Sequence, residues 1–230
     1  MSDLVQYSLN DGVATLTLAN GKVNAVSPAV IEAFNAALDL AQAAEAVVIV
    51  TGQPGILSGG YDLKVMASGP QAAIDLVAAG STLARRMLAH PQPIIVACSG
   101  HAVAKGAFLL LSADYRLGVD GLFSIGLNEV KIGMTMHHVG IALARDRLTK
   151  PVFQRSVINA EMFTPQSALS AGFLDQVVPA DQLMATANAV AQEYKKLNMK
   201  AHAHTKLKVR KDLLEALDAA IATDKLTSLI

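Results

Sequence analysis

Two short apolar runs, each followed by a loop that contains glycine, constrain the fold of this chain most strongly. Residues 46–51 and 94–98 are almost entirely β-branched or aliphatic, which is typical of strands buried on both faces. A helix is predicted between them, over about 71–90. Strand–helix alternation favours parallel pairing with right-handed crossovers, so the sequence predicts an α/β fold. Ligands of such sheets bind beyond the carboxyl ends of the strands, here at loops 52–60 and 99–106.

The rest of the chain divides into a mixed core and a helical tail. A hairpin is predicted over 5–19, because Asn10-Asp11-Gly12 separates two alternating segments. Further short strands are expected over 115–119, 123–125 and 174–178, and helices over 28–44, 104–112, 137–148, 151–159, 165–171, 181–197 and 206–223. We therefore expect a core over 1–180 and a C-terminal helical region over 181–230. That region packs on the core or on a neighbouring subunit.

Composition excludes several classes of protein. Of the 230 residues 52% are apolar, and 19 basic side chains balance 19 acidic ones. This excludes a disordered chain and gives no charge pattern for general nucleic-acid binding. No apolar run is long enough to span a membrane and the N-terminus has no export signal, so we expect a soluble, cytoplasmic protein. The single cysteine, Cys98, excludes an internal disulfide, and the neutral apolar composition favours an oligomer.

Several common sites are missing from the sequence. No dinucleotide-binding glycine pattern follows the first strand, and Ala107 stands where a phosphate-binding loop needs lysine. Neither Ser58 nor Ser99 lies in the strand–turn–helix motif of a nucleophilic serine. The adjacent His137 and His138 would point about 100° apart on a helix, so we expect no metal site there.

The two glycine-bearing loops can each present backbone N–H groups to a ligand. Gly59 and Gly60 let the chain turn sharply, and the second loop runs into a helix whose first N–H groups have no internal partner. Two such donors facing each other would form an oxyanion hole. The alternative is that both segments are simply tight turns.

A third candidate is Glu129, the one carboxylate in a mostly apolar segment between Gly126 and Gly133. Burial would raise its pKa towards neutrality and make it a usable proton shuttle. The alternative is a surface glutamate paired with Lys131.

Together these segments resemble the crotonase superfamily, also called the enoyl-CoA hydratase/isomerase family. The similarity covers nearly the whole chain, through residues 21–26, 58–63, 99–100, 113–116, 125–133, 163–165 and 171–179. It implies a ββα spiral with a C-terminal helical trimerisation region, and a homotrimer or hexamer. It also implies an acyl-CoA thioester as the small-molecule substrate, with coenzyme A as part of that substrate and no separate cofactor or metal.

The resemblance also assigns roles to particular residues. By position, the two oxyanion donors would be the backbone N–H groups of Tyr61 and Lys105. Gly59 would lie against the adenine of coenzyme A through its backbone, and Val23 and Asn24 would lie along the coenzyme A groove.

The catalytic carboxylates distinguish the subfamilies. Hydratases of this family use two glutamates, whereas here Glu129 fills the later position and Phe108, expected in the acyl pocket, stands at the earlier one. The chain therefore looks closest to mitochondrial-type 3,2-trans-enoyl-CoA isomerases, which implies a double-bond shift in fatty acid β-oxidation. Two alternatives stay open: a hydratase or other crotonase-type enzyme, and a non-catalytic acyl-CoA-binding protein.

Two residues depart from the family pattern. Lys105 stands where a small residue is usual, so its side chain is expected to leave the acyl pocket towards solvent or a phosphate of coenzyme A. Tyr61 is also larger than usual, and its ring is expected to narrow the substrate channel. His137 or His138 is expected near the pocket mouth.

Overall fold

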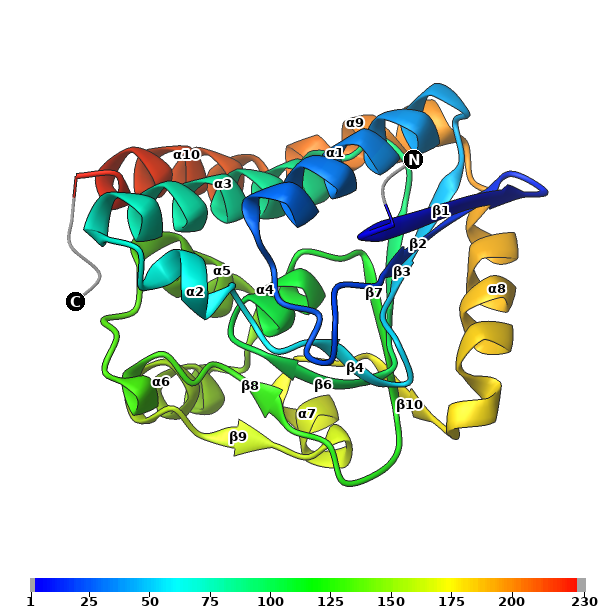
Figure 1. The fold of residues 1–230 in the computed structure, drawn as a ribbon. Helices are drawn as coiled ribbons and strands as arrows, with labels where there is room; N and C mark the ends of the chain where they lie inside the picture. Colours follow the sequence, from blue (N-terminus) through cyan, green and yellow to red (C-terminus); the bar gives the residue numbers. More distant parts are fainter. Residues whose placement is uncertain (1–2, 227–230) are drawn as a thin grey trace.

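The computed structural model describes residues 3–226, and a six-stranded sheet forms its centre (Figure 1). The strands lie in the order β1 (Val5–Asn10), β2 (Val13–Leu18), β3 (Val47–Thr51), β5 (Ile94–Cys98), β7 (Tyr115–Val119) and β10 (Gln176–Val178). The hairpin β1–β2 is antiparallel and every other neighbouring pair is parallel. The predicted α/β class and the hairpin are confirmed.

Both faces of this sheet are buried at β3 and β5, which explains why these strands are apolar. Val47 and Ile49 belong to a cluster completed by α8 (Leu183–Tyr194). Val48 and Val50 point the other way, into the larger core shared with α1 (Pro28–Ala43) and α3 (Pro70–Ala89). Figure 1 shows α8 on one side of the sheet and α1 and α3 on the other.

A second, smaller sheet was not predicted. It contains β4 (Gly55–Ser58), β6 (Gly100–Val103), β8 (Ile125–Gly126) and β9 (Met162–Phe163), in that order. The segments expected to be loops after β3 and β5 therefore begin as strands, and β4 and β6 pair in parallel. Strands of two to four residues are too short to show an alternating pattern in the sequence, which is why the sheet escaped prediction.

The remaining helices connect the sheets or follow them. They are α2 (Leu63–Met66), α4 (Lys105–Leu111), α5 (His138–Arg147), α6 (Lys150–Asn159), α7 (Pro165–Ala171), α9 (Met199–Val209) and α10 (Lys211–Asp224), with short 3-10 turns η1 (Val130–Ile132) and η2 (Ala180–Gln182). The single helix expected over 206–223 is wrong, because Arg210 separates α9 from α10. None of the helices within residues 3–226 has the length and apolarity to cross a bilayer.

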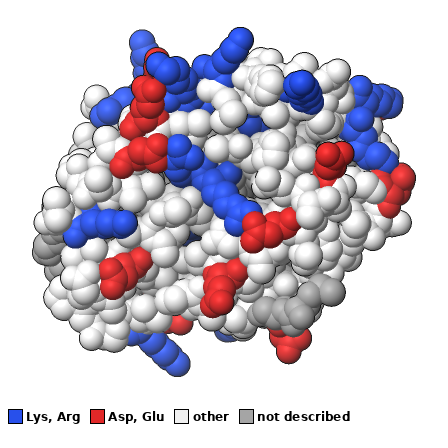
Figure 2. Space-filling view, turned by 90° about the horizontal axis from the view of Figure 1, so that it is seen from above, with Lys and Arg blue, Asp and Glu red and all other residues white. Residues whose placement is uncertain are grey.

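The C-terminal helices pack on the core of the same chain. α10 lies against α3 and α5, while α8 covers strands β3, β5 and β7. Arg85 of α3 and Asp218 of α10 form an ion pair at 2.5 Å. On the face that α1, α3 and α10 form, basic and acidic side chains lie beside one another (Figure 2).

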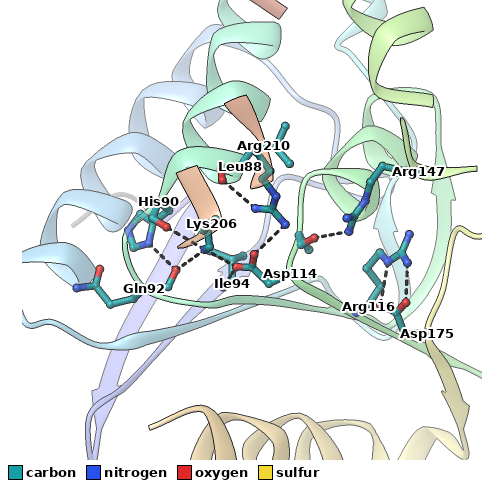
Figure 3. Close-up of polar contacts among 11 residues, drawn as sticks. Leu88, His90, Gln92, Ile94, Asp114, Arg116, Arg147, Asp175, Lys206 and Arg210 are labelled. Carbon is teal, nitrogen blue, oxygen red and sulfur yellow. Dashed lines mark hydrogen bonds and ion pairs between the residues drawn. The ribbon is translucent and has the colours of Figure 1, made fainter. Parts of the chain in front are cut away.

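Asp114 ties α9 to the sheet through a buried ionic network (Figure 3). Its carboxylate accepts a hydrogen bond from the backbone N–H of Ile94 at 2.7 Å and pairs with Lys206 at 2.7 Å and Arg210 at 2.9 Å. Lys206 Nζ also donates to the carbonyl oxygens of His90 and Gln92. Burial lowers the pKa of Lys206, and the neighbouring Asp114 carboxylate opposes that change. Asp114 is thus the counterion that lets two cations lie inside the protein.

We expect Asp114→Asn to lower the free energy of unfolding by about 3–5 kcal/mol, because it leaves the buried Lys206 and Arg210 without their counterion. Urea unfolding at pH 7 measures the change. Glu215→Gln is the matched control, since Glu215 and Lys211 form an exposed pair at 3.5 Å, and its effect should stay below about 0.5 kcal/mol. Equal, small effects of the two variants would contradict a structural role for Asp114.

Candidate active site

A cavity of about 140 Å³ lies where the segments after β4 and β6 meet residues 128–137. Its mouth is formed by exposed side chains and its inner end by buried ones, including Val77 and Glu129. The described residues that line it are Gly59, Gly60, Tyr61, Leu63, Met66, Val77, Ala104, Asn128, Glu129, Ile132, Met134, Thr135 and His137. Both predicted glycine-bearing loops and the predicted glutamate therefore face one space.

The backbone N–H of Tyr61 is free to donate into this space. Gly60 and Asp62 both hydrogen bond to Val26, through the Gly60 carbonyl at 2.8 Å and the Asp62 N–H at 3.0 Å. In a parallel bridge of this kind the residue between them turns its own N–H to the opposite side. Among the described residues, no protein acceptor receives the Tyr61 N–H.

The second donor is the backbone N–H of Lys105, in the first turn of α4. Ala104 precedes it with φ +51° and ψ −118°, a conformation that costs a non-glycine residue about 1–3 kcal/mol. The N–H of Ala104 is held by the carbonyl of Gly126 at 2.9 Å. Within the described chain the N–H of Lys105 also has no protein acceptor. A strained backbone beside a free donor is typical of a functional site.

The two donor segments touch at Gly60. This residue has φ +112°, and a Cβ placed on it would lie 3.1 Å from the Cβ of Ala104 and 3.8 Å from the backbone nitrogen of Lys105. Glycine permits both the positive φ and the close approach. The structure thus brings the two predicted donor segments together beside one cavity, as an oxyanion hole requires.

Glu129 is the only carboxylate among the described residues that line the cavity. It lies just before η1 and is 6% exposed, and its Oε2 has no hydrogen-bond partner in the protein. Burial raises the pKa of Glu129 to about 7. The alternative of a surface glutamate paired with Lys131 is not seen, and a carboxyl with this pKa can take or give a proton near neutral pH.

The structure places Phe108 one layer behind the cavity wall. Its ring packs edge-to-face on the ring of His137, with 5.2 Å between centroids, and it is His137 that faces the cavity. Burial lowers the pKa of His137, so this ring is neutral near pH 7. Phe108 therefore supports the pocket through His137 and does not line it directly, contrary to expectation.

The side chain of Lys105 is buried, so the expectation that it points to solvent or to a phosphate of coenzyme A is wrong. The residue is 1% exposed and its Nζ donates to the carbonyl oxygen of Gly80 in α3 at 2.5 Å. Burial lowers the pKa of Lys105 to about 7. Because α3 packs against α2 and α4, a carbonyl group of α3 lies within reach of the Lys105 side chain. The sequence did not indicate this contact.

The residues expected to contact coenzyme A fall into two groups. Val23 is exposed, and its carbonyl accepts the N–H of Gly59 at 2.8 Å, so these two residues lie together at the surface. Asn24 is buried, and its amide donates to the carbonyls of Leu18 and Leu57. The Asn24 side chain therefore holds the loop together and is not presented to a ligand.

Asn128 and Asp224 contribute to the site but were not identified as doing so from the sequence, whereas His137, expected near the pocket mouth, lines the cavity as a buried residue. Asp224, near the end of α10, accepts the N–H groups of His138 and Val139 at 2.8 and 3.0 Å and the ring nitrogen of His138 at 2.7 Å. It thus caps α5 directly behind the cavity wall. No local pattern connects residues 86 positions apart, so only the fold could reveal this contact. Between residues 3 and 226 no three metal-ligating side chains gather.

Comparison with known proteins agrees with this geometry. The family model for enoyl-CoA hydratase/isomerase matches residues 8–227. An enoyl-CoA hydratase/isomerase family protein from Pseudomonas syringae is 73% identical, with a TM-score of 0.98 over 99% of both chains. An enoyl-CoA isomerase from Mycobacterium tuberculosis is 39% identical, with a TM-score of 0.93 over 98% of this chain and 99% of that one. Human mitochondrial enoyl-CoA delta isomerase 1 is 27% identical over 90% of this chain and 70% of its own length.

The α/β spiral, the paired backbone donors and the buried glutamate thus coincide with a family match over nearly the whole chain. The protein belongs to the enoyl-CoA hydratase/isomerase family, the crotonase superfamily.

Proposed function

We propose that this enzyme converts 3-enoyl-CoA thioesters to 2-enoyl-CoA thioesters, with Glu129 as the only proton carrier. The observation that carries the proposal is the single carboxylate among the described residues that line the cavity, which is buried, has no hydrogen-bond partner at Oε2 and has its pKa raised to about 7. The isomerase name of the human relative supports it, whereas the Mycobacterium tuberculosis relative is named both an isomerase and a probable hydratase.

The geometry suggests how the reaction would proceed. The thioester oxygen accepts hydrogen bonds from the backbone N–H groups of Tyr61 and Lys105, which draws electrons from C2. Glu129 removes a proton from C2, and the electrons of that bond pass through C2 to the oxygen, giving a conjugated dienolate. The electrons then return from the oxygen to form the C2–C3 double bond. The electrons of the former C3–C4 double bond take up the same proton from Glu129 at C4. Substrate and product therefore contain the same atoms and electrons, and Glu129 ends in its starting protonation state.

Hydration would need a second group to hold and activate water. Phe108 occupies the position of the first hydratase glutamate, and its ring contacts His137. His137 is neutral near pH 7 because burial lowers its pKa. The cavity wall therefore favours isomerisation, and formation of 3-hydroxyacyl-CoA would instead support the hydratase alternative.

The remaining parts of this proposal follow from the family. We propose that coenzyme A enters only as part of the substrate, with no separate cofactor, and that the reaction serves fatty acid β-oxidation. Assembly into trimers or hexamers and a cytoplasmic location remain predictions.

We expect Glu129→Gln to lower kcat/KM for 3-hexenoyl-CoA by about 10²–10⁴-fold, because glutamine can neither take nor give the proton. Absorbance of the conjugated thioester, with product identification, measures the rate. Glu32→Gln, on the exposed face of α1, is the control and should leave the rate unchanged. A Glu129→Gln variant as active as the wild type would rule out this base.

A label experiment tests whether one group carries the proton. With deuterium at C2 of the 3-enoyl thioester, part of the 2-enoyl product should carry deuterium at C4, since Glu129 is only 6% exposed and exchange of its proton with solvent is limited. Mass spectrometry of the product measures the transferred fraction. Complete loss of the label would point to two separate groups or to rapid exchange with solvent.

The pH dependence follows from the ionised form of the base. Glu129 must be a carboxylate to remove the C2 proton, so kcat/KM should fall as the pH drops below about 7. A rate profile between pH 5 and pH 9 measures the midpoint. A midpoint near the ordinary glutamate value would show that burial does not tune this group.

The same pKa predicts a stability change that does not depend on turnover. The pKa of Glu129 is raised from 4.5 to about 7 by folding, so its protonated form stabilises the fold at low pH and this contribution is lost as the pH rises towards 7. The free energy of unfolding of Glu129→Gln minus that of the wild type should therefore be larger at pH 8 than at pH 5, by up to about 3 kcal/mol. Urea unfolding of both proteins at the two pH values measures the difference. A difference independent of pH would contradict it.

A further inference from the structure

The side chains of both oxyanion-donor residues end at the same point of α3. A Cβ on Gly80 would lie only 2.2 Å from the hydroxyl of Tyr61 and 2.7 Å from its Cζ. The Tyr61 hydroxyl donates a long hydrogen bond to the carbonyl of Val77 at 3.4 Å, and Lys105 Nζ donates to the carbonyl of Gly80 at 2.5 Å. The turn of α3 from Val77 to Gly80 therefore holds both side chains.

The ring of Tyr61 stands at the inner part of the cavity. The mouth is marked by Leu63 and Ile132, which are 67% and 52% exposed. Val77, Glu129 and His137 line the other end, and each is less than 8% exposed. Burial of the Tyr61 hydroxyl raises its pKa, in line with its position between the cavity and α3.

The ring has no room to withdraw. The absent side chain of Gly80 provides the space that the ring already fills, and the hydrogen bond of Lys105 pins this turn of α3 to the start of α4. Further along α3, the ion pair of Arg85 with Asp218 and the hydrogen bond of Arg86 to Asn35 fix the helix to α10 and α1. The inner wall is therefore held by contacts to α4, α10 and α1.

The size of the cavity indicates what fits in front of this wall. A volume of about 140 Å³ is close to that of an apolar protein cavity that holds one benzene ring, about six carbon atoms. An acyl chain of more than about six carbons would contact the ring of Tyr61, or its end would have to extend out of the cavity mouth.

We propose that Tyr61, pressed against Gly80, closes the inner end of the acyl cavity and restricts the substrate to short acyl chains of up to about six carbons. The proposal deepens the proposed function and rests on it, because it takes the cavity as the acyl site.

Binding of saturated acyl-CoA thioesters tests it without turnover. Isothermal titration with butyryl-, hexanoyl-, octanoyl- and dodecanoyl-CoA should show affinity rising to hexanoyl-CoA, as each buried methylene adds to binding, and then falling by about tenfold or more at dodecanoyl-CoA. Equal affinity for hexanoyl- and dodecanoyl-CoA would overturn the chain-length limit and leave the acyl-CoA function intact. Absence of binding by all four thioesters would overturn both.

Variants at the wall should move the limit in opposite directions. Tyr61→Ala and Tyr61→Leu shorten the side chain and keep the backbone donor, so dodecanoyl-CoA should bind about tenfold more tightly than to wild type. Gly80→Ala should push the ring into the cavity and weaken hexanoyl-CoA by about tenfold. Thr82→Ala, on the exposed face of α3, is the control and should change neither affinity.

The double variant Tyr61→Ala/Gly80→Ala separates this role from general damage to the fold. If Gly80→Ala acts through the ring, it should have little further effect once the ring is removed. Additive losses of hexanoyl-CoA affinity in the double variant would overturn the role of the ring. Tyr61→Ala and Tyr61→Leu variants that fold and keep the wild-type chain-length preference would overturn it as well.

Discussion

The close approach of two backbone segments at Gly60 is the constraint on which the active site depends. Residues after β4 and β6 can place two free N–H groups side by side only because these strands pair in parallel and end at the same edge of the small sheet. Gly60 lets the first segment lie against Ala104, and Ala104 accepts a strained conformation that turns the second segment inward. Both free donors belong to the backbone, which leaves the side chains of Tyr61 and Lys105 available for another role.

The side chains of Tyr61 and Lys105 connect the site to helix α3. Both end at α3, while Asp224 of α10 caps α5 behind the other wall. The C-terminal helices, tied to the sheet by Asp114, are therefore part of the support of the cavity. Glu129 lies between these walls, and its burial raises its pKa to about 7, so the packing that closes the cavity also sets the pKa of the carboxyl that lines it.

Much of the fold could be predicted from the sequence because its signals are local. The hairpin over 5–19, the buried strands and most helices follow from periodicity and turn residues. The short strands β4, β6 and β9 were missed, since two to four residues carry no measurable period, and β8 overlaps the strand expected over 123–125 only at Ile125. The break at Arg210 lies within a continuous helical pattern. Among the site residues, Tyr61, Lys105 and Glu129 were identified through their motifs and His137 or His138 was expected near the pocket mouth, whereas Asp224 had no such signal.

The sequence by itself determined which residues could carry the chemistry: two glycine-bearing donor segments, one glutamate in an apolar segment, and phenylalanine where a second glutamate would stand. The tertiary structure alone decided where the side chains go. It turned Lys105 inward to Gly80, placed Phe108 behind His137 and engaged Asn24 within its own loop. The physical reason is that motifs record the local chain, whereas the direction and burial of a side chain depend on elements packed against it from elsewhere in the chain.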